Sequence, residues 1–186
     1  MKKIVASILI FFNIITHLNA QSLYDLEIEG ISVGDSALSF FNKNEIKNNT
    51  WDYYKDKKFT PVQMTGLYFF ETYQGVDFDY KTTDKNYTIY SLSGILKYND
   101  KNIKDCYKKM DAIDEELQSF LVDFRKEDKA TWKHGVDPTG ESTFTDIYYE
   151  SDEGTVTITC YDFSEKQEKK GSGDYLSIMI ALNEWV

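Results

Sequence analysis

The chain has 186 residues, with 21 Lys and Arg against 31 Asp and Glu, and a formal net charge of −10. Proteins that bind nucleic acid gather positive charge to replace phosphate counterions, so this balance argues against nucleic acid and against an anionic membrane as partners. Only two prolines occur and no repeat is visible. We therefore expect one globular domain behind any leader.

The first 20 residues have the pattern of a cleavable signal peptide. Two lysines precede an apolar stretch over residues 4–15, and Ala20 stands before a polar segment. That stretch is shorter than the roughly 20 residues of a spanning helix, so we expect cleavage before Gln21 and no stable membrane anchor. The mature domain would cover residues 21–186, lie in the periplasm or outside the cell, and carry a net charge of −12, because cleavage removes two lysines and no acid.

Residues 33–48 are predicted to form the first helix. Ser32 can cap its first turn, and Asp35 can reach back as in a capping box. The apolar residues that follow fall near one helical face: Leu38, Phe41 and Ile46.

Residues 59–98 are predicted to form two or three strands. They are rich in Tyr, Phe, Thr and Ile, with the clearest alternation near their end. Gly66, Gly75 and residues 84–86 mark the expected turns.

A long amphipathic helix is the strongest local prediction. After a capping Asp100, apolar residues recur every three or four positions from Ile103 to Phe124, and Lys, Asp and Glu fill the remaining positions. One side of this helix should therefore face the core.

Three further strands are predicted over residues 142–149, 155–163 and 174–185. A turn at 150–154 and a polar loop at 164–174 would join them into an antiparallel meander. The whole order predicts the α+β class, with a single antiparallel sheet and two helices packed on one face.

Cys106 and Cys160 are predicted to form a disulfide. Both fall on the apolar side of their own elements, and an even number of cysteines in an exported protein favours pairing. The alternative is two buried thiols that act as small apolar side chains.

Few residues carry a recognisable catalytic or metal-binding pattern. His134 is the only histidine left after cleavage, which is too few ligands for zinc, and no serine-hydrolase elbow occurs. Asp77 and Asp79 flank Phe78, so a strand would place both carboxylates on one face, where such pairs can hydrolyse glycosides or hold a hard cation. The simpler interpretation is the solvent face of a strand. We expect no catalytic residue, no metal site and no cofactor.

Aromatic residues are abundant, at 16% of the chain. Exposed rings could stack on a sugar or on another protein, but alternating strands also use such rings for packing.

Residues 28–38, Ile-Glu-Gly-Ile-Ser-Val-Gly-Asp-Ser-Ala-Leu, resemble the opening of a set of small exported bacterial proteins to which no activity is attached. The likeness covers residues 24–48. More distantly, the turn and short helix resemble the BamE/SmpA-like and β-lactamase-inhibitor-like envelope domains. That resemblance implies an antiparallel sheet with helices on one face and a role in protein binding. The chain departs from the lipoprotein in having Gln21 where the lipidated cysteine would stand.

These observations together favour a non-enzymatic envelope or secreted binding module with a protein partner. The alternatives are a carboxylate-dependent hydrolase and a glycan-binding protein. The sequence names no small-molecule ligand.

Processing can be tested directly. Mass spectrometry of the protein recovered from the envelope or the medium should find an N-terminus within about two residues of Gln21, because the small residue Ala20 ends the leader pattern. An intact Met1 on that protein would contradict the prediction.

Overall fold

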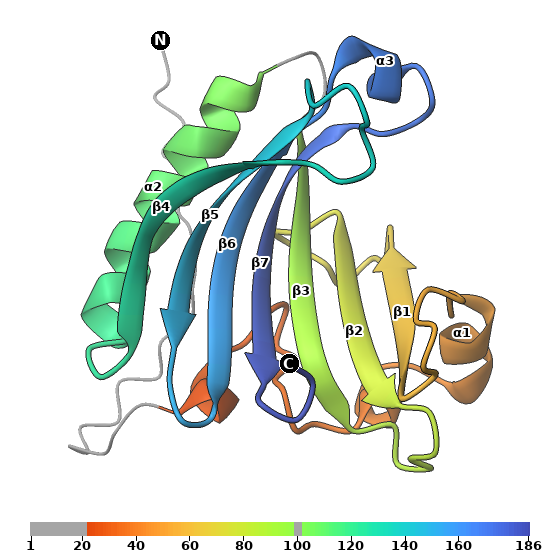
Figure 1. The fold of residues 1–186 in the computed structure, drawn as a ribbon. Coiled ribbons are helices and arrows are strands. Elements are labelled where there is room, and N and C mark those ends of the chain that lie inside the picture. The colour runs from red at the N-terminus through yellow and green to blue at the C-terminus, as the bar shows by residue number, and fades with distance from the viewer. Residues whose placement is uncertain (1–21, 99–101) are drawn as a thin grey trace, which may run out of the picture.

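A computed structural model describes residues 22–98 and 102–186 (Figure 1). The predicted signal peptide and the predicted helix cap Asp100 lie outside these residues. The described part contains one antiparallel sheet of seven strands in the order β1-β2-β3-β7-β6-β5-β4. The α+β class and the single antiparallel sheet are thus confirmed. The strands are β1 Phe59–Thr65, β2 Gly75–Lys81, β3 Ile89–Tyr98, β4 Arg125–Lys133, β5 Thr143–Glu150, β6 Gly154–Asp162 and β7 Asp174–Leu182.

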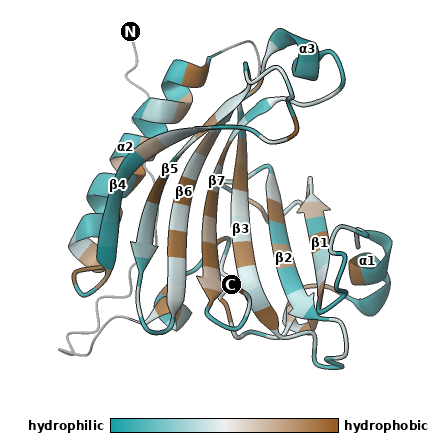
Figure 2. Ribbon diagram, in the orientation of Figure 1, coloured by the Kyte–Doolittle hydropathy of each residue, from teal (hydrophilic) through white to brown (hydrophobic). Residues whose placement is uncertain are grey.

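The two faces of the sheet differ in chemistry because side chains alternate along each strand. One face, which we name the covered face, carries buried apolar side chains that appear as brown bands in Figure 2. Its central members lie on β6 and β7: Val156, Ile158, Cys160, Leu176, Ile178 and Ile180. The opposite face, which we name the open face, carries on the same strands mostly hydroxyl and aromatic side chains: Thr155, Thr157, Thr159, Tyr161, Tyr175, Ser177 and Met179.

The long helix α2 (Ile103–Phe120) lies against the sheet and contacts β3, β6 and β7 (Figure 1). Its apolar stripe supplies the buried side chains of Cys106, Met110 and Ile113. The helix is shorter than predicted, since it ends at Phe120, and Phe124 lies in the turn that leads to β4.

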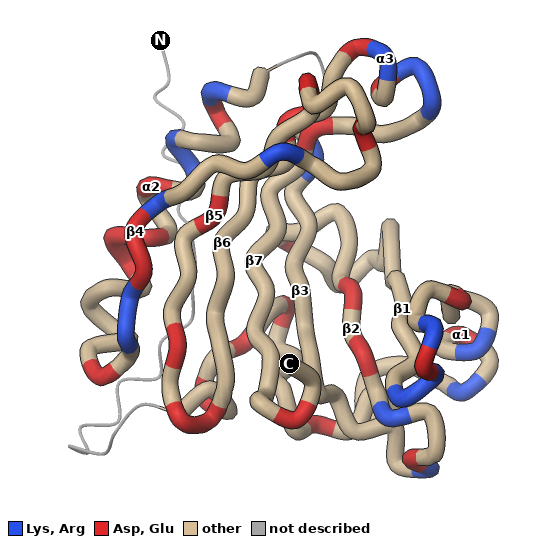
Figure 3. Tube along the Cα trace, viewed as in Figure 1, with Lys and Arg blue, Asp and Glu red and all other residues tan. Residues whose placement is uncertain are grey.

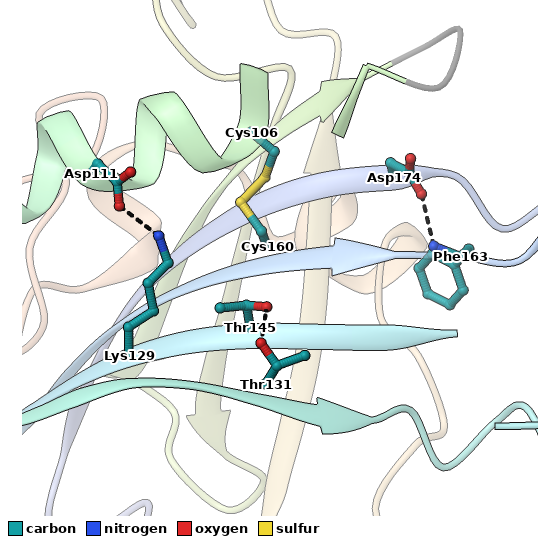
Figure 4. The surroundings of a disulfide bond; sticks show 8 residues. All are labelled: Cys106, Asp111, Lys129, Thr131, Thr145, Cys160, Phe163 and Asp174. Atoms are coloured by element: carbon teal, nitrogen blue, oxygen red, sulfur yellow. Dashed lines mark hydrogen bonds and ion pairs between the residues drawn. A yellow bond between two sulfur atoms is a disulfide. The ribbon is translucent and has the colours of Figure 1, made fainter. Parts of the chain in front are cut away.

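A disulfide joins α2 to the covered face. The Cα atoms of Cys106 and Cys160 are 6.0 Å apart, within the range of roughly 4.4 to 6.8 Å that a bridge requires. Figure 4 shows the bond running from the helix to β6. The predicted pairing is confirmed.

Strand β4 was missed by the sequence prediction because its residues are mostly charged and do not alternate. Two of its lysines instead reach the helix. Lys126 Nζ lies 2.7 Å from the carboxylate of Asp114. Lys129 Nζ lies 2.6 Å from the carboxylate of Asp111, and Figure 4 shows this second pair. Charged side chains on an edge strand also discourage pairing with other sheets.

The predicted helix 33–48 is wrong in its first half. Asp35 does accept a hydrogen bond from the Ser32 backbone at 3.0 Å, but the chain there runs beside β3 and not into a helix. The backbone N–H of Gly34 donates to Ile89, and that of Ile89 donates to Asp35, so these groups cannot also serve a helical turn. In the described residues before β1, the helical segments are two short 3-10 turns, Leu23–Asp25 and Ala37–Ser39, and α1, Lys43–Asn48.

The segment between β6 and β7 was predicted to be a polar loop. It contains one short helix, α3 (Glu165–Glu168). Its base is fixed by Asp174, which accepts a hydrogen bond from the Phe163 backbone at 2.8 Å (Figure 4).

Removal of the disulfide should destabilise the protein. The bond closes a sequence separation of 54 residues, and on the chain-entropy account the double variant Cys106→Ala, Cys160→Ala should lose about 4 kcal/mol of unfolding free energy. Urea unfolding under oxidising conditions measures this loss.

Thiol labelling provides the control for that variant. Wild-type protein denatured without reductant should show no reactive thiol, and two after reduction. Two labelled thiols before reduction, or a double variant as stable as the wild type, would contradict the prediction.

Candidate functional site

Asp77 and Asp79 both project from β2 onto the open face. Between them Phe78 points to the covered face, where it is buried. Asp77 lies opposite Gln63 on β1 and Ser93 on β3, and Asp79 lies opposite Ser91. The prediction that the two carboxylates share one face is confirmed, and they appear as acidic bands on β2 in Figure 3.

Both carboxylates are more buried than a solvent-facing strand would allow. Asp79 is 7% exposed, and the Ser91 hydroxyl donates a hydrogen bond of 2.7 Å to its Oδ2. Gln63 Nε2 donates to Asp77 Oδ2 at 3.2 Å. The Oδ1 atoms of both aspartates are buried and have no hydrogen-bond partner among the described residues. The interpretation of this pair as a simple solvent face is therefore wrong.

Burial changes the acidity of the pair. Loss of solvation, reinforced by the charge of Asp79, raises the pKa of Asp77 to about 6, although Gln63 and Lys97 oppose the shift. Burial also raises the pKa of Asp79, against the hydrogen bond from Ser91 and the nearby Tyr54 hydroxyl and Trp185 indole. Near pH 7 the site therefore holds poorly solvated negative charge.

Tyrosine side chains surround the carboxylates. Burial and then the charge of Asp79 raise the pKa of Tyr54, which precedes β1. Burial and, among smaller effects, the charge of Asp77 raise the pKa of Tyr175 on β7. Asp79 thus has the Tyr54 ring close to it, and Trp185, which follows β7, also faces Asp79.

An aromatic cluster continues the open face beyond these tyrosines. The rings of Tyr161 and Tyr175 stack with their centroids 4.3 Å apart. The ring centroids of His134 and Phe163 are 5.1 Å apart. His134 was predicted to be exposed beside a turn, but it is half-buried against these rings, and its Nδ1 accepts a hydrogen bond from the Val136 backbone. The histidine ring therefore packs within the cluster.

Three lysines of the described residues bear on the pair: the charge of Lys97 acts on Asp77, and two others are engaged elsewhere. Lys81 forms an ion pair with Glu184, and Lys58 Nζ donates to the Glu184 backbone carbonyl at 2.9 Å. Among the described residues, no Lys or Arg forms an ion pair with Asp77 or Asp79. The negative charge of the pair is therefore left without a counter-ion from these side chains.

Comparison of the chain with protein-family models, curated proteins and solved structures finds no match. The resemblance of residues 28–38 to exported envelope proteins stays a prediction. In the described residues, no helix is long and apolar enough to span a membrane, and no group of three or more His, Cys, Asp or Glu side chains could hold a metal ion.

Sequence reasoning identified the two aspartates but missed the side chains that bury them. Tyr54 and Trp185 lie in segments outside the strands, and Gln63 and Ser91 are placed by strand register. A period of two along β2 showed that the carboxylates share a face; no local pattern showed what packs over them.

The stability of the protein should depend on the ionisation of Asp77. Its folded-state pKa of about 6 lies above the ordinary 3.8, so between these values the folded protein binds more protons than the unfolded chain. Ionisation therefore lowers the free energy of unfolding as the pH rises through this window. Asp77→Asn should be more stable than the wild type by about 2 kcal/mol at pH 7, after allowance for partial exposure, and the difference should vanish toward pH 3.5.

Urea unfolding at a series of pH values measures this difference. The exposed Asp128→Asn provides the matched control and should show no gain that grows with pH. Equal stability of Asp77→Asn and the wild type at pH 7 would refute the predicted effect.

Proposed function

We propose that the protein is an exported, non-enzymatic binding module that binds a partner protein on the open face of its sheet. The observation that carries this proposal is the difference in side-chain chemistry between the two faces of the sheet. The covered face holds the apolar core beneath α2, whereas the open face presents hydroxyl groups, aromatic rings and two carboxylates with unpartnered oxygens. The disulfide supports export, since such bonds persist mainly in oxidising compartments.

The proposal retains the expectation that both helices lie on the same side of the sheet, which would leave the second face free. Two contacts support it. Cys160 holds α2 on the covered face, and the Phe41 ring, just before α1, stacks on Phe78 with centroids 5.6 Å apart. Both contacts use side chains of the covered face.

A protein partner suits this surface better than a small molecule. Small ligands are usually held in concave pockets that bury most of their surface. Two depressions of the described surface do not include Asp77 or Asp79; one is lined by residues around Trp51 and Phe59, with Tyr54 among them, and the other by residues around Phe124 and Glu150. A broad face with scattered aromatic and polar groups is typical of a protein interface.

A carboxylate-dependent hydrolase is the second candidate, favoured by the raised pKa of Asp77 beside a second carboxylate. Its weakness is geometric, because both groups project from one strand to the same side and do not face each other across a bound substrate. Glycan binding has a similar weakness, because Tyr161 and Tyr175 stack on each other and so use ring faces that a sugar would need.

Photo-crosslinking can test which face binds. The photo-reactive residue p-benzoylphenylalanine would replace Met179, at the centre of the open face, or Glu115, an exposed residue of α2. Irradiation in the native compartment should give a discrete protein adduct from position 179 and none from position 115, because only the open face is proposed to be the interface. Mass spectrometry would identify the adduct.

The reverse pattern, or equal adducts from both positions, would refute binding on the open face. Cleavage of an oligosaccharide panel by the wild type and loss of that cleavage in Asp77→Asn would instead support the hydrolase.

A further inference from the structure

We propose that the open face binds a guanidinium group, the side chain of an arginine on the partner protein, at Asp77 and Asp79. This inference rests on the proposed function, since it specifies the chemistry recognised at the same face. Asp77 and Asp79 each have a buried Oδ1 atom without a hydrogen-bond partner among the described residues.

The unpartnered acceptors are the first argument. Each aspartate has one oxygen that accepts a hydrogen bond and one buried oxygen that accepts none. Buried polar atoms are nearly always hydrogen-bonded, so such atoms indicate an absent donor. Residues two apart on a strand are about 7 Å apart along the chain, so one ligand with several donors can serve both carboxylates.

The absence of a counter-ion is the second argument. Lys58 and Lys81 are held at Glu184, and the exposed Lys97, whose charge lowers the pKa of Asp77, forms no ion pair with either aspartate among the described residues. Two poorly solvated carboxylates side by side repel each other, and a cation relieves that repulsion where a neutral donor does not. The net charge of the whole chain, −10, also attracts a basic partner.

The neighbouring rings select guanidinium over other cations. Tyr54 lies close to Asp79 and Trp185 faces it, and aromatic faces attract cations. A guanidinium is planar, stacks on such rings and directs a fork of N–H donors at carboxylates, whereas a lysine ammonium is a compact point charge. A calcium ion would need about six to eight oxygen ligands, more than this group of side chains supplies.

Two of the side chains that approach Asp79 come from loop segments. Tyr54 belongs to the segment between α1 and β1, and Trp185 belongs to the tail after β7; both lie outside the strands (Figure 1). They can therefore turn aside while the hydrogen bonds of the sheet stay intact. The Trp185 indole N–H faces Asp79 and provides a local reporter of binding.

A peptide titration followed by nuclear magnetic resonance tests the proposal. The probe is acetyl-Gly-Arg-Gly-amide, and its matched neutral control carries citrulline in place of arginine. The arginine peptide should shift the signals of Asp77, Asp79 and the Trp185 indole with a millimolar dissociation constant, and the citrulline and lysine peptides should bind at least about tenfold more weakly. Asp77→Asn and Asp79→Asn should each weaken binding by about tenfold or more, while Asp128→Asn should not.

Equal binding of the citrulline peptide, or unchanged binding by both Asn variants, would overturn the proposal. Because Asp77→Asn is expected to be at least as stable as the wild type, its loss of binding cannot be assigned to unfolding. The crosslinking experiment separates this inference from the proposed function: an adduct at position 179 that survives both Asn substitutions rejects the arginine site but leaves binding on the open face standing.

Discussion

The attachment of α2 to one face of the sheet is the constraint on which the rest of the structure depends. The helix stripe and the Cys106–Cys160 bond together hold the helix over the apolar side chains of the central strands. The N-terminal segment completes this side with buried Ile31 and Val33. Because the apolar core lies on the covered face, the open face does not need apolar side chains. It can therefore carry hydroxyl, aromatic and acidic side chains.

Burial of Asp77 and Asp79 lowers the stability of the folded protein, and the fold does not require carboxylates at these two positions. Apolar or amide side chains at these positions would leave β2 paired with both neighbours and Phe78 in the core. Poorly solvated carboxylates, each with an unpartnered oxygen, make the free protein less stable than it could be. Groups that lower the stability of the free protein and are stabilised only when a ligand binds are characteristic of binding sites. The burial of this pair therefore agrees with the proposed binding role.

The sequence predicted those features that depend on local periodicity. Alternation located most strands, the stripe from Ile103 located α2, and the two patterns together placed Cys106 and Cys160 in one core. Strand β4 was missed because its charged residues serve the helix through ion pairs and not the core through alternation. The burial of Asp79 was also beyond prediction, because Tyr54 and Trp185 reach it from segments about 25 and 106 positions away in the chain, where no periodicity extends.

The edges of the sheet add a reason for recognition through its face. At one edge, the segment before β1 is already bonded to it, since Trp51 donates to Pro61 and Gln63 donates to Asn49 at 3.0 Å each. At the other edge, β4 is charged and irregular, with a register shift between Glu127 and Ala130. Strand addition, which recognises backbone, is therefore disfavoured at both edges. The proposed partner would then be recognised by side chains on the open face, where the charged groups and the aromatic rings would decide which residue fits.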